Sequence, residues 1–236
     1  MEVHLVVAPV FATNCCVVVS GASEAGADCV VIDAGAGVSA AVSALIKDNG
    51  WNLRAVLATH GHVDHTWDAG PLCAEFDVPF RIHELDAYRL ADPFGTLAPK
   101  DAAPDLSVAV AIQQAVRALG VSASDYQAPA QVVTFSDEPY LDFGAVRLQL
   151  NHAPGHTEGS TLYISDDIGD TGAVFSGDVL FAGSIGRTDL PGGDSATMSK
   201  TLARLKTELA PKLGVIPGHG PVTTVAQELA TNPYWN

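Results

Sequence analysis

The feature that most constrains the fold of this chain is a cluster of imidazole and carboxylate side chains directly after an apolar run. The segment Leu53–Thr59 predicts a strand, and the run THGHVDH begins at its last residue. On a continued strand His60, His62 and Asp64 would share one face, whereas a turn would let His65 converge with them. Imidazole and carboxylate ligands suit zinc, and also iron or manganese. A histidine-rich polar loop could arise by chance, but three of the chain's eight histidines fall here, which favours a metal site.

Three further predicted strands end in the same way. Each is followed by a turn that contains glycine and one ligand-type residue, namely His156, Asp178 or His219. Glycine lets the backbone bend sharply and approach a ligand closely. A lone histidine or aspartate in a turn is usually just solvated, but four strand ends of one design predict a single shared site. The three strands are Val146–His152, Ala173–Phe175 and Val215–Pro217.

Periodicity elsewhere predicts short strands alternating with amphipathic helices. The order is strands and then a helix, twice over, which predicts an α/β (α+β) fold of two packed sheets with helices outside. The segment Ala91–Ala130 interrupts this pattern and is interpreted as an insertion or lid on a single domain spanning residues 1–236. The remaining predicted strands are Val3–Val10, Cys15–Ser20, Cys29–Asp33, Pro79–Ile82, Gln131–Phe135 and Thr161–Ser165. The predicted helices are Ser39–Asn49, Pro71–Phe76, Asp105–Leu119, Ser195–Leu209 with Ser195 as its cap, and a last helix capped by Thr224 with Gln227 three residues on.

Composition and charge narrow the class of protein. With 47% hydrophobic and 17% charged residues the chain is globular, and no stretch approaches eighteen apolar residues, so no membrane-spanning helix is expected. The start Met1-Glu2-Val3-His4 lacks the basic and apolar regions of a signal peptide, which predicts a cytoplasmic location. A net charge of -15 disfavours nucleic acid and anionic membranes as partners, but not a small substrate beside a metal. The four cysteines show no CxxC spacing and are interpreted as buried, reduced thiols.

These motifs resemble the metallo-β-lactamase superfamily, whose signature is a THxHxDH loop followed by separated His, Asp and His ligands. Within it the chain is similar to the glyoxalase II (hydroxyacylglutathione hydrolase)-like proteins, because GSIGRTDLPGG, from Gly183 to Gly193, looks like a stretch common in that subgroup. The resemblance runs from about Val3 to about Asn232, except for the Ala91–Ala130 region. It implies a four-layer αββα sandwich with the site at one edge between the sheets.

The resemblance also implies two adjacent divalent metal ions, with Zn²⁺ favoured and Fe or Mn as alternatives. The implied ligands are His60, His62 and His156 for the first ion, Asp64, His65 and His219 for the second, and Asp178 as the bridge. The implied reaction is attack of a metal-bound hydroxide on a thioester or ester carbonyl, and a thiolate leaving group needs little acid catalysis. Asp64 and Asp178 are the implied catalytic residues, Asp64 as a candidate to orient the hydroxide and accept its proton.

Other polar residues are assigned smaller roles. Arg187 is the candidate for contacting substrate, since it lies in a Gly-rich loop near the last aspartate ligand. The competing interpretation is that Arg187 and Asp189 stabilise this loop as a hydrogen-bonded pair. His4, His83 and His152 are interpreted as ordinary structural or surface histidines, with His83 the one placed to orient a ligating group.

Departures from the family pattern leave other functions open. The chain ends at Asn236 without the helical domain that binds glutathione in longer glyoxalase II proteins, so the thiol of the substrate is left open. Asp178 disfavours a β-lactamase, since the best-known zinc β-lactamases carry cysteine there, and His62 disfavours the diiron electron-transfer branch, which carries glutamate. A persulfide dioxygenase with one iron on His60, His156 and Asp178 remains an alternative, as do a lactonase and a non-catalytic metal-binding protein. The oligomeric state is left open.

Overall fold

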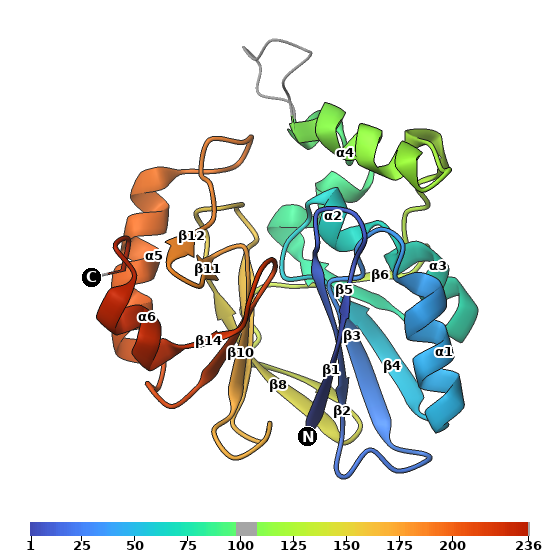
Figure 1. Ribbon diagram of the computed structural model, residues 1–236, viewed down its shortest axis with the longest axis horizontal. Helices are drawn as coiled ribbons and strands as arrows, with labels where there is room; N and C mark the ends of the chain where they lie inside the picture. Colours follow the sequence, from blue (N-terminus) through green and yellow to red (C-terminus); the bar gives the residue numbers. More distant parts are fainter. Residues whose placement is uncertain (98–107, 236) are drawn as a thin grey trace.

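Two six-stranded sheets pack face to face in the computed structural model, which describes residues 1–97 and 108–235 (Figure 1). Helices cover the outer face of each sheet, so the molecule has four layers. This arrangement confirms the predicted αββα sandwich of the α/β (α+β) class. Within the described ranges, no helix is both long and apolar enough to cross a bilayer.

The first sheet holds the N-terminal strands in sequence order. Across the sheet they are β1 (Glu2–Val7), β2 (Asn14–Val19), β3 (Asp28–Ile32), β4 (Asn52–Leu57), β5 (Phe80–His83) and β6 (Val132–Phe135). Strands β1 to β3 run antiparallel and β3 to β6 run parallel. Helices α1 (Ser39–Asn49) and α3 (Ala69–Phe76) cover the outer face. Since parallel strands all end at one edge, the loops after β3, β4 and β5 meet there.

The second sheet holds the C-terminal strands. Across the sheet they are β14 (Thr223–Thr224), β13 (Gly214–Pro217), β10 (Ala173–Gly177), β9 (Thr161–Ser165), β8 (Val146–His152) and β7 (Tyr140–Phe143). Helices α5 (Ser195–Glu208) and α6 (Val225–Thr231) cover its outer face. Thr224 caps α6 as predicted, by accepting a hydrogen bond from Gln227 N (3.1 Å). A separate ribbon pairs β11 (Leu180–Phe181) with β12 (Ser184–Ile185).

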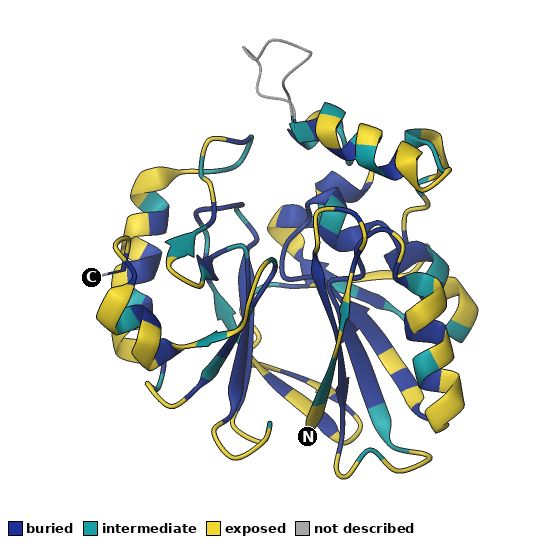
Figure 2. Cartoon of the chain, in the orientation of Figure 1, coloured by how far each residue is buried: buried dark blue, intermediate teal, exposed yellow. Residues whose placement is uncertain are grey.

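Strand β2 shows why the apolar runs of the sequence are continuous. Its residues Cys15, Val17 and Val19 pack towards the helices, whereas Cys16 and Val18 pack between the sheets. A strand covered on both faces has no solvent side and therefore shows no polar alternation. Figure 2 shows the central strands buried along most of their length, with exposed residues on the outer faces of the helices. The four cysteines are free and buried, as predicted.

A smaller apolar cluster joins part of the predicted insertion to the histidine-rich segment. Helix α4 (Val108–Ala118) buries Ile112 and Val116 in a cluster that includes Trp67 and the first residue of α2 (Val63–Thr66). In Figure 1, α4 lies directly above α2. Short 3-10 helices complete this region and its surroundings: η1 (Glu84–Leu90), η2 (Gly95–Leu97) and η4 (Ala123–Asp125).

The predicted helix over 105–119 corresponds to α4 from Val108 onward. Residues 98–107, which include its predicted first turn and much of the predicted loop, lie outside the described residues. That the Ala91–Ala130 region acts as a lid therefore stays a prediction.

Some element boundaries differ from the predictions. Ser195 does not cap α5, because Asp194 is extended and its carboxylate accepts a hydrogen bond from Thr197 N (2.6 Å). Strand β1 ends at Val7 rather than Val10, because the chain there turns into a hairpin that contains two non-glycine residues of positive φ. The sequence does not predict β7, β11, β12 or β14, and the last three have only two residues each, which is too few to show a periodicity.

Candidate metal centre

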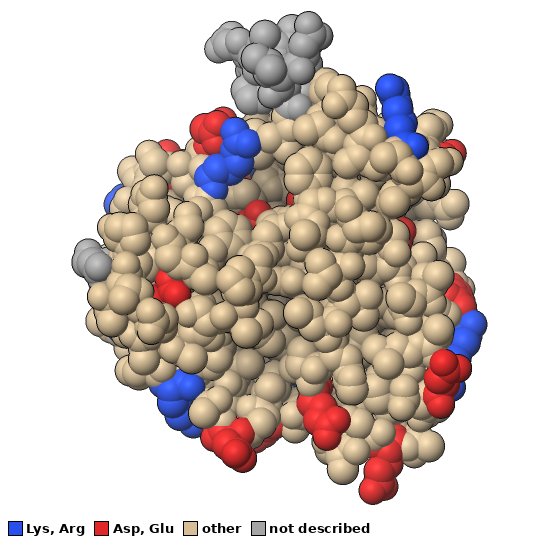
Figure 3. Space-filling view, viewed as in Figure 1, with Lys and Arg blue, Asp and Glu red and all other residues tan. Residues whose placement is uncertain are grey.

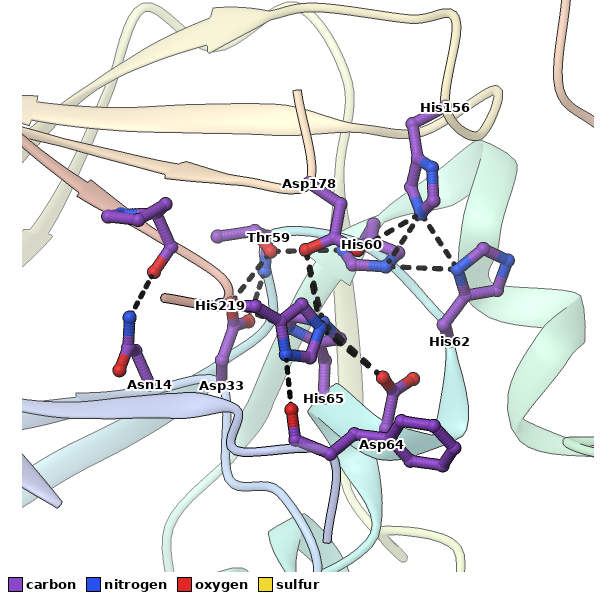
Figure 4. Close-up of polar contacts among 12 residues, drawn as sticks. Asn14, Asp33, Thr59, His60, His62, Asp64, His65, His156, Asp178 and His219 are labelled. Atoms are coloured by element: carbon purple, nitrogen blue, oxygen red, sulfur yellow. Dashed lines mark hydrogen bonds and ion pairs between the residues drawn. The ribbon is translucent and has the colours of Figure 1, made fainter. Parts of the chain in front are cut away.

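The seven predicted ligand residues lie together at one edge between the two sheets (Figure 4). They come from the loop after β4 (His60 and His62), from α2 (Asp64 and His65), and from the turns after β8 (His156), β10 (Asp178) and β13 (His219). Three groups of three bring their ligand atoms within 4.8 Å of one another: His60, His62 and His156; His60, His65 and Asp178; and Asp64, His65 and His219. Every strand end singled out in the sequence therefore reaches the same place.

The first group, here called the histidine half, consists of His60, His62 and His156. His156 Nε2 lies 2.9 Å from His62 Nδ1 and 3.3 Å from His60 Nε2, and His60 Nε2 lies 3.1 Å from His62 Nδ1. All three residues are buried, with exposed fractions of 1% to 3%. Three ring nitrogens thus form a small triangle inside the protein, and the three rings are almost entirely shielded from solvent.

The second group, here called the mixed half, consists of Asp64, His65 and His219. His65 Nε2 lies 3.1 Å from His219 Nε2, and His219 Nε2 lies 3.4 Å from Asp64 Oδ2. The His65 side chain is fully buried, but those of Asp64 and His219 are 14% and 24% exposed. Of the two halves, this one reaches the surface.

Asp178 stands between the two halves and faces both (Figure 4). Its Oδ2 lies 3.6 Å from His156 Nε2, while its Oδ1 lies 3.4 Å from His65 Nε2 and 3.6 Å from His219 Nε2. Oδ1 is buried and has no hydrogen-bond partner among the described residues. A Cβ on Gly218 would come within 2.2 Å of Oδ1, so the glycine in this turn leaves room for the carboxylate.

Hydrogen bonds on the far side of the rings fix which nitrogen faces the centre. Four histidines donate Nδ1–H to a protein acceptor, so that Nε2 faces the centre. These pairs are His60 with Thr59 Oγ1 (3.1 Å), His65 with Asp33 Oδ2 (3.0 Å), His156 with Arg187 O (2.8 Å) and His219 with Phe11 O (2.9 Å). The fifth imidazole, that of His62, presents Nδ1 instead.

This donor set fits divalent metal ions. In the histidine half, the inward lone pairs of neighbouring neutral rings repel one another unless a cation lies between them. Ligand nitrogens of a tetrahedral zinc site, with bonds of about 2.0–2.1 Å, lie roughly 3.3 Å apart, which is close to the spacings of the histidine half. Asp178 Oδ1, which accepts no hydrogen bond from the described residues, is also available to bind a cation. The residues therefore fit one ion in each half with Asp178 between them.

The electrostatics of the two halves differ. Burial lowers the pKa of His60, His62 and His156, so these rings are neutral and ready to bind metal. Burial also lowers the pKa of His65, but nearby carboxylates, of which Asp178 is the strongest, outweigh burial and raise it well above its usual value. The histidine half is thus uncharged, while the mixed half is a network of opposite charges.

Asp33 is a functional residue that the sequence reasoning missed. Its carboxylate accepts hydrogen bonds from Thr59 N (2.7 Å) and Thr59 Oγ1 (2.8 Å) as well as from His65. It follows β3 with a positive φ of 60°, so the backbone is held in an uncommon conformation to aim it. The predicted strand Cys29–Asp33 ends at this residue, and its place at a strand end, like those of the ligands, is the signal that could have revealed it.

The remaining candidates lie outside the ligand groups. The Arg187 guanidinium forms two hydrogen bonds of 2.7 Å to Asp189, and its side chain is 48% exposed. Arg187 contributes to the centre through its backbone carbonyl, which accepts a hydrogen bond from His156 Nδ1. This contact does not depend on the type of side chain at position 187. His83 stacks on His152 at 4.3 Å, and His4 packs on Trp51 at 4.9 Å, so these three histidines serve other contacts.

The surface over this side of the molecule is weakly charged. In Figure 3, the Lys and Arg side chains of the described residues lie apart from one another around the margin of the face. This face therefore offers no continuous basic patch of the kind that binds a phosphate backbone.

A centre of two ligand groups that share one carboxylate, at the edge of an αββα sandwich, is of the metallo-hydrolase type. The family model described as the metallo-beta-lactamase superfamily matches residues 8–221. The chain belongs to this superfamily.

Several proteins are similar to this chain over most of their length. The probable metallo-hydrolase YqgX of Bacillus subtilis is 31% identical over 208 residues, which cover 88% of this chain and 87% of that protein. The hydroxyacylglutathione hydrolase GloC of Haemophilus influenzae is 28% identical over 240 residues, covering 100% and 99%. The crystal structure of TTHA1623 in a di-iron-bound form is 31% identical with a TM-score of 0.72, covering 98% of this chain and 99% of that one.

Proposed function

We propose that this protein is a binuclear metal-dependent hydrolase that cleaves a hydroxyacyl thioester to a hydroxy acid and a thiol. The observation that carries the proposal is the position of Asp178, whose two oxygens face opposite ligand groups at 3.4–3.6 Å. A carboxylate placed in this way is suited to bridge two ions. The ligands are His60, His62 and His156 in one half, Asp64, His65 and His219 in the other, and Asp178 between them.

The bound ions, with Zn²⁺ favoured and iron or manganese as alternatives, supply a water of lowered pKa as nucleophile and polarise the substrate carbonyl. The substrate approaches from the mixed half, because its Asp64 and His219 side chains reach the surface. Burial raises the pKa of Asp64, but His65 and His219 lower it by more, so Asp64 stays ionised. Asp64 therefore acts mainly as a metal ligand, and its role as acceptor for the nucleophile's proton is secondary.

The thioester class is supported by the similarity to GloC along the whole chain. A thiolate leaves without strong acid catalysis, and no acidic donor beyond the ligand set is needed for its departure. The thiol itself is left open, since the side chain of Arg187, the candidate for substrate contact, is paired with Asp189.

The test is metal content and turnover measured on the same preparation. Protein purified without added metal is subjected to elemental analysis and assayed on 2-hydroxyacyl thioesters of several thiols. About two equivalents of metal per chain with thioester turnover supports the proposal. Two equivalents of metal without turnover on any ester or thioester contradicts it.

The same preparation separates the alternatives. The crystal structure of TTHA1623 holds two irons, so iron is a real possibility for this chain as well. One equivalent of iron with oxygen uptake on a persulfide would indicate the dioxygenase with His60, His156 and Asp178 as ligands. Turnover of lactones but not thioesters would indicate a lactonase of the same centre.

A further inference from the structure

Two fully buried charged side chains lie beside the metal centre without belonging to its ligand set. Asp86 and Arg89 are both on η1, the 3-10 helix after β5, and both are 0% exposed. Charged residues are almost never fully buried unless they are paired and hydrogen-bonded. The Arg89 Nε and Asp86 Oδ1 atoms are 3.3 Å apart, so the two side chains form a buried ion pair.

Asp86 connects the two loops that carry the histidine half. Its Oδ2 accepts hydrogen bonds from Gly61 N (2.8 Å) and from Thr157 Oγ1 (2.7 Å), and its Oδ1 accepts one from Gly159 N (2.9 Å). Gly61 lies between His60 and His62, and Thr157 follows the third histidine directly. One buried carboxylate therefore ties together segments that are almost a hundred residues apart in the chain.

Glycines on both sides make this approach possible. A Cβ on Gly61 would lie 2.8 Å from Arg89 Cδ, and a Cβ on Gly159 would lie 2.7 Å from Asp86 Cγ. Both contacts are closer than Cβ atoms come to their neighbours. The glycine inside the histidine motif is thus explained by the packing of Asp86 and Arg89, not by the metal ligands themselves.

Arg89 extends the link to the loop before α5. Its Nη2 contacts the Glu158 carboxylate and donates to Pro191 O (3.0 Å). Gly192, the next residue, would place a Cβ only 2.2 Å from Nη2. The guanidinium is therefore enclosed by the loop that also supplies the carbonyl of Arg187 to His156.

We infer that Asp86, paired with Arg89, is a positioning residue that holds His60 and His62 against His156 so that the histidine half is formed before metal binds. Among the described residues, the hydrogen bonds of Asp86 reach the loops of this half and no ligand of the mixed half. Loss of the carboxylate therefore weakens metal binding in one half only. The inference rests on the metal centre of the proposed function, but not on its substrate.

The test measures zinc affinity in each half separately. His219→Ala leaves the histidine half intact, and His156→Ala leaves the mixed half intact. Competition with a chromophoric zinc chelator then gives the affinity of each variant with and without Asp86→Asn. The amide has one acceptor oxygen where the carboxylate has two, so at least one loop loses its partner.

The expected result is a loss of about 10- to 100-fold in zinc affinity from Asp86→Asn in the His219→Ala background. In the His156→Ala background the change stays within about twofold, as for independent sites. Equal losses in both backgrounds would mean that Asp86 supports the fold as a whole. No loss in either, in folded protein, would also overturn the inference.

Thr157 provides a milder pair of variants in case Asp86→Asn fails to fold. Thr157→Val removes the hydroxyl that donates to Asp86, whereas Thr157→Ser retains it. Thr157→Val weakens zinc binding in the histidine half, whereas Thr157→Ser retains it.

Asp28→Asn is the matched control. Asp28 also pairs with an arginine (Arg54) and accepts a hydrogen bond from a backbone N–H, but it lies at the opposite end of β3 from the centre. Wild-type protein that binds two zinc ions but turns over no substrate would contradict the proposed function and leave this inference standing.

Discussion

The histidine half and the mixed half each contribute three side chains, but they are stabilised in different ways. The histidine half is buried and uncharged, and its loops are held by hydrogen bonds that they donate to Asp86. The mixed half reaches the surface, and its His65 is held by the opposite charges of Asp178 and Asp33. The histidine half is therefore held by loops that bind the buried Asp86 carboxylate, and its own rings are neutral. The mixed half is held by pairs of opposite charges, which bound metal ions would rearrange. We therefore expect the two sites to differ in metal affinity and in their response to pH.

Asp178→Asn has the largest expected effect, because Asp178 lies between the two halves and faces both. The variant removes the negative charge shared by both halves, so we expect kcat/KM to fall by more than about 100-fold and metal content to fall in both halves. Steady-state kinetics and elemental analysis measure this. Asp166→Asn, at an exposed aspartate paired with Lys212, is the control. Loss of metal from one half alone would show that Asp178 does not bridge.

Asp33→Asn tests the support of the mixed half, because Asp33 accepts directly from His65 but reaches His60 of the histidine half only through Thr59. Asp33 is 2% exposed and accepts three hydrogen bonds, so we expect a loss of about 1–3 kcal/mol in the free energy of unfolding. We also expect about 10- to 100-fold weaker zinc binding in the mixed half. Urea unfolding and chelator competition measure the two effects. If Asp33→Asn lowered zinc affinity only in the histidine half, Asp33 would support that half and not the mixed half.

The pH dependence of the metal-free protein should also differ between the halves. Burial lowers the pKa of His62 below its unfolded value of about 6.5, so the unfolded chain binds this proton more readily. Stability from this residue is therefore lost as pH falls below about 6.5. His65 has a raised pKa, so its contribution is present below about 6.5 and is lost as pH rises through the folded value.

Two variants separate these contributions. His62→Gln should flatten the loss of stability as pH falls from about 7 to about 5, whereas His65→Gln should flatten the loss of stability as pH rises above about 6.5. Thermal unfolding of chelator-treated protein from about pH 5 up to alkaline pH measures both slopes. Changes that fall in the same pH range in the two variants would argue against the charge difference between the halves.

Arg187→Gln has the smallest expected effect. The guanidinium is exposed and paired with Asp189, so its loss should cost less than about 1 kcal/mol of stability. The backbone carbonyl that accepts from His156 remains, and metal affinity should be unchanged. Steady-state kinetics on the best thioester show whether KM changes as well. A large rise in KM with unchanged kcat would instead assign the side chain to substrate binding.

Much of the fold and of the candidate site could be predicted from the sequence. The apolar strands and their glycine turns predict both sheets, because burial on both faces leaves continuous apolar runs such as that of β2. The ligand-type residues all lie in segments that directly follow strands, and parallel strands bring these segments to one edge. The strands β11, β12 and β14 could not be predicted, since two residues are too few to show a periodicity. The Asp194 cap could not be predicted either, since the neighbouring Ser195 is an equally suitable capping residue.

The sequence by itself determined the class of chemistry, because seven imidazole and carboxylate residues in strand-end turns have few other uses. Only the tertiary structure decided how those residues are held. Asp33 and Asp86 act on residues 25 or more positions away, and two of the acceptors for histidine N–H are the backbone carbonyls of Arg187 and Phe11. A backbone carbonyl is present at every residue and leaves no mark on the sequence. Its role is set by the path of the chain, which the packing of the two sheets decides.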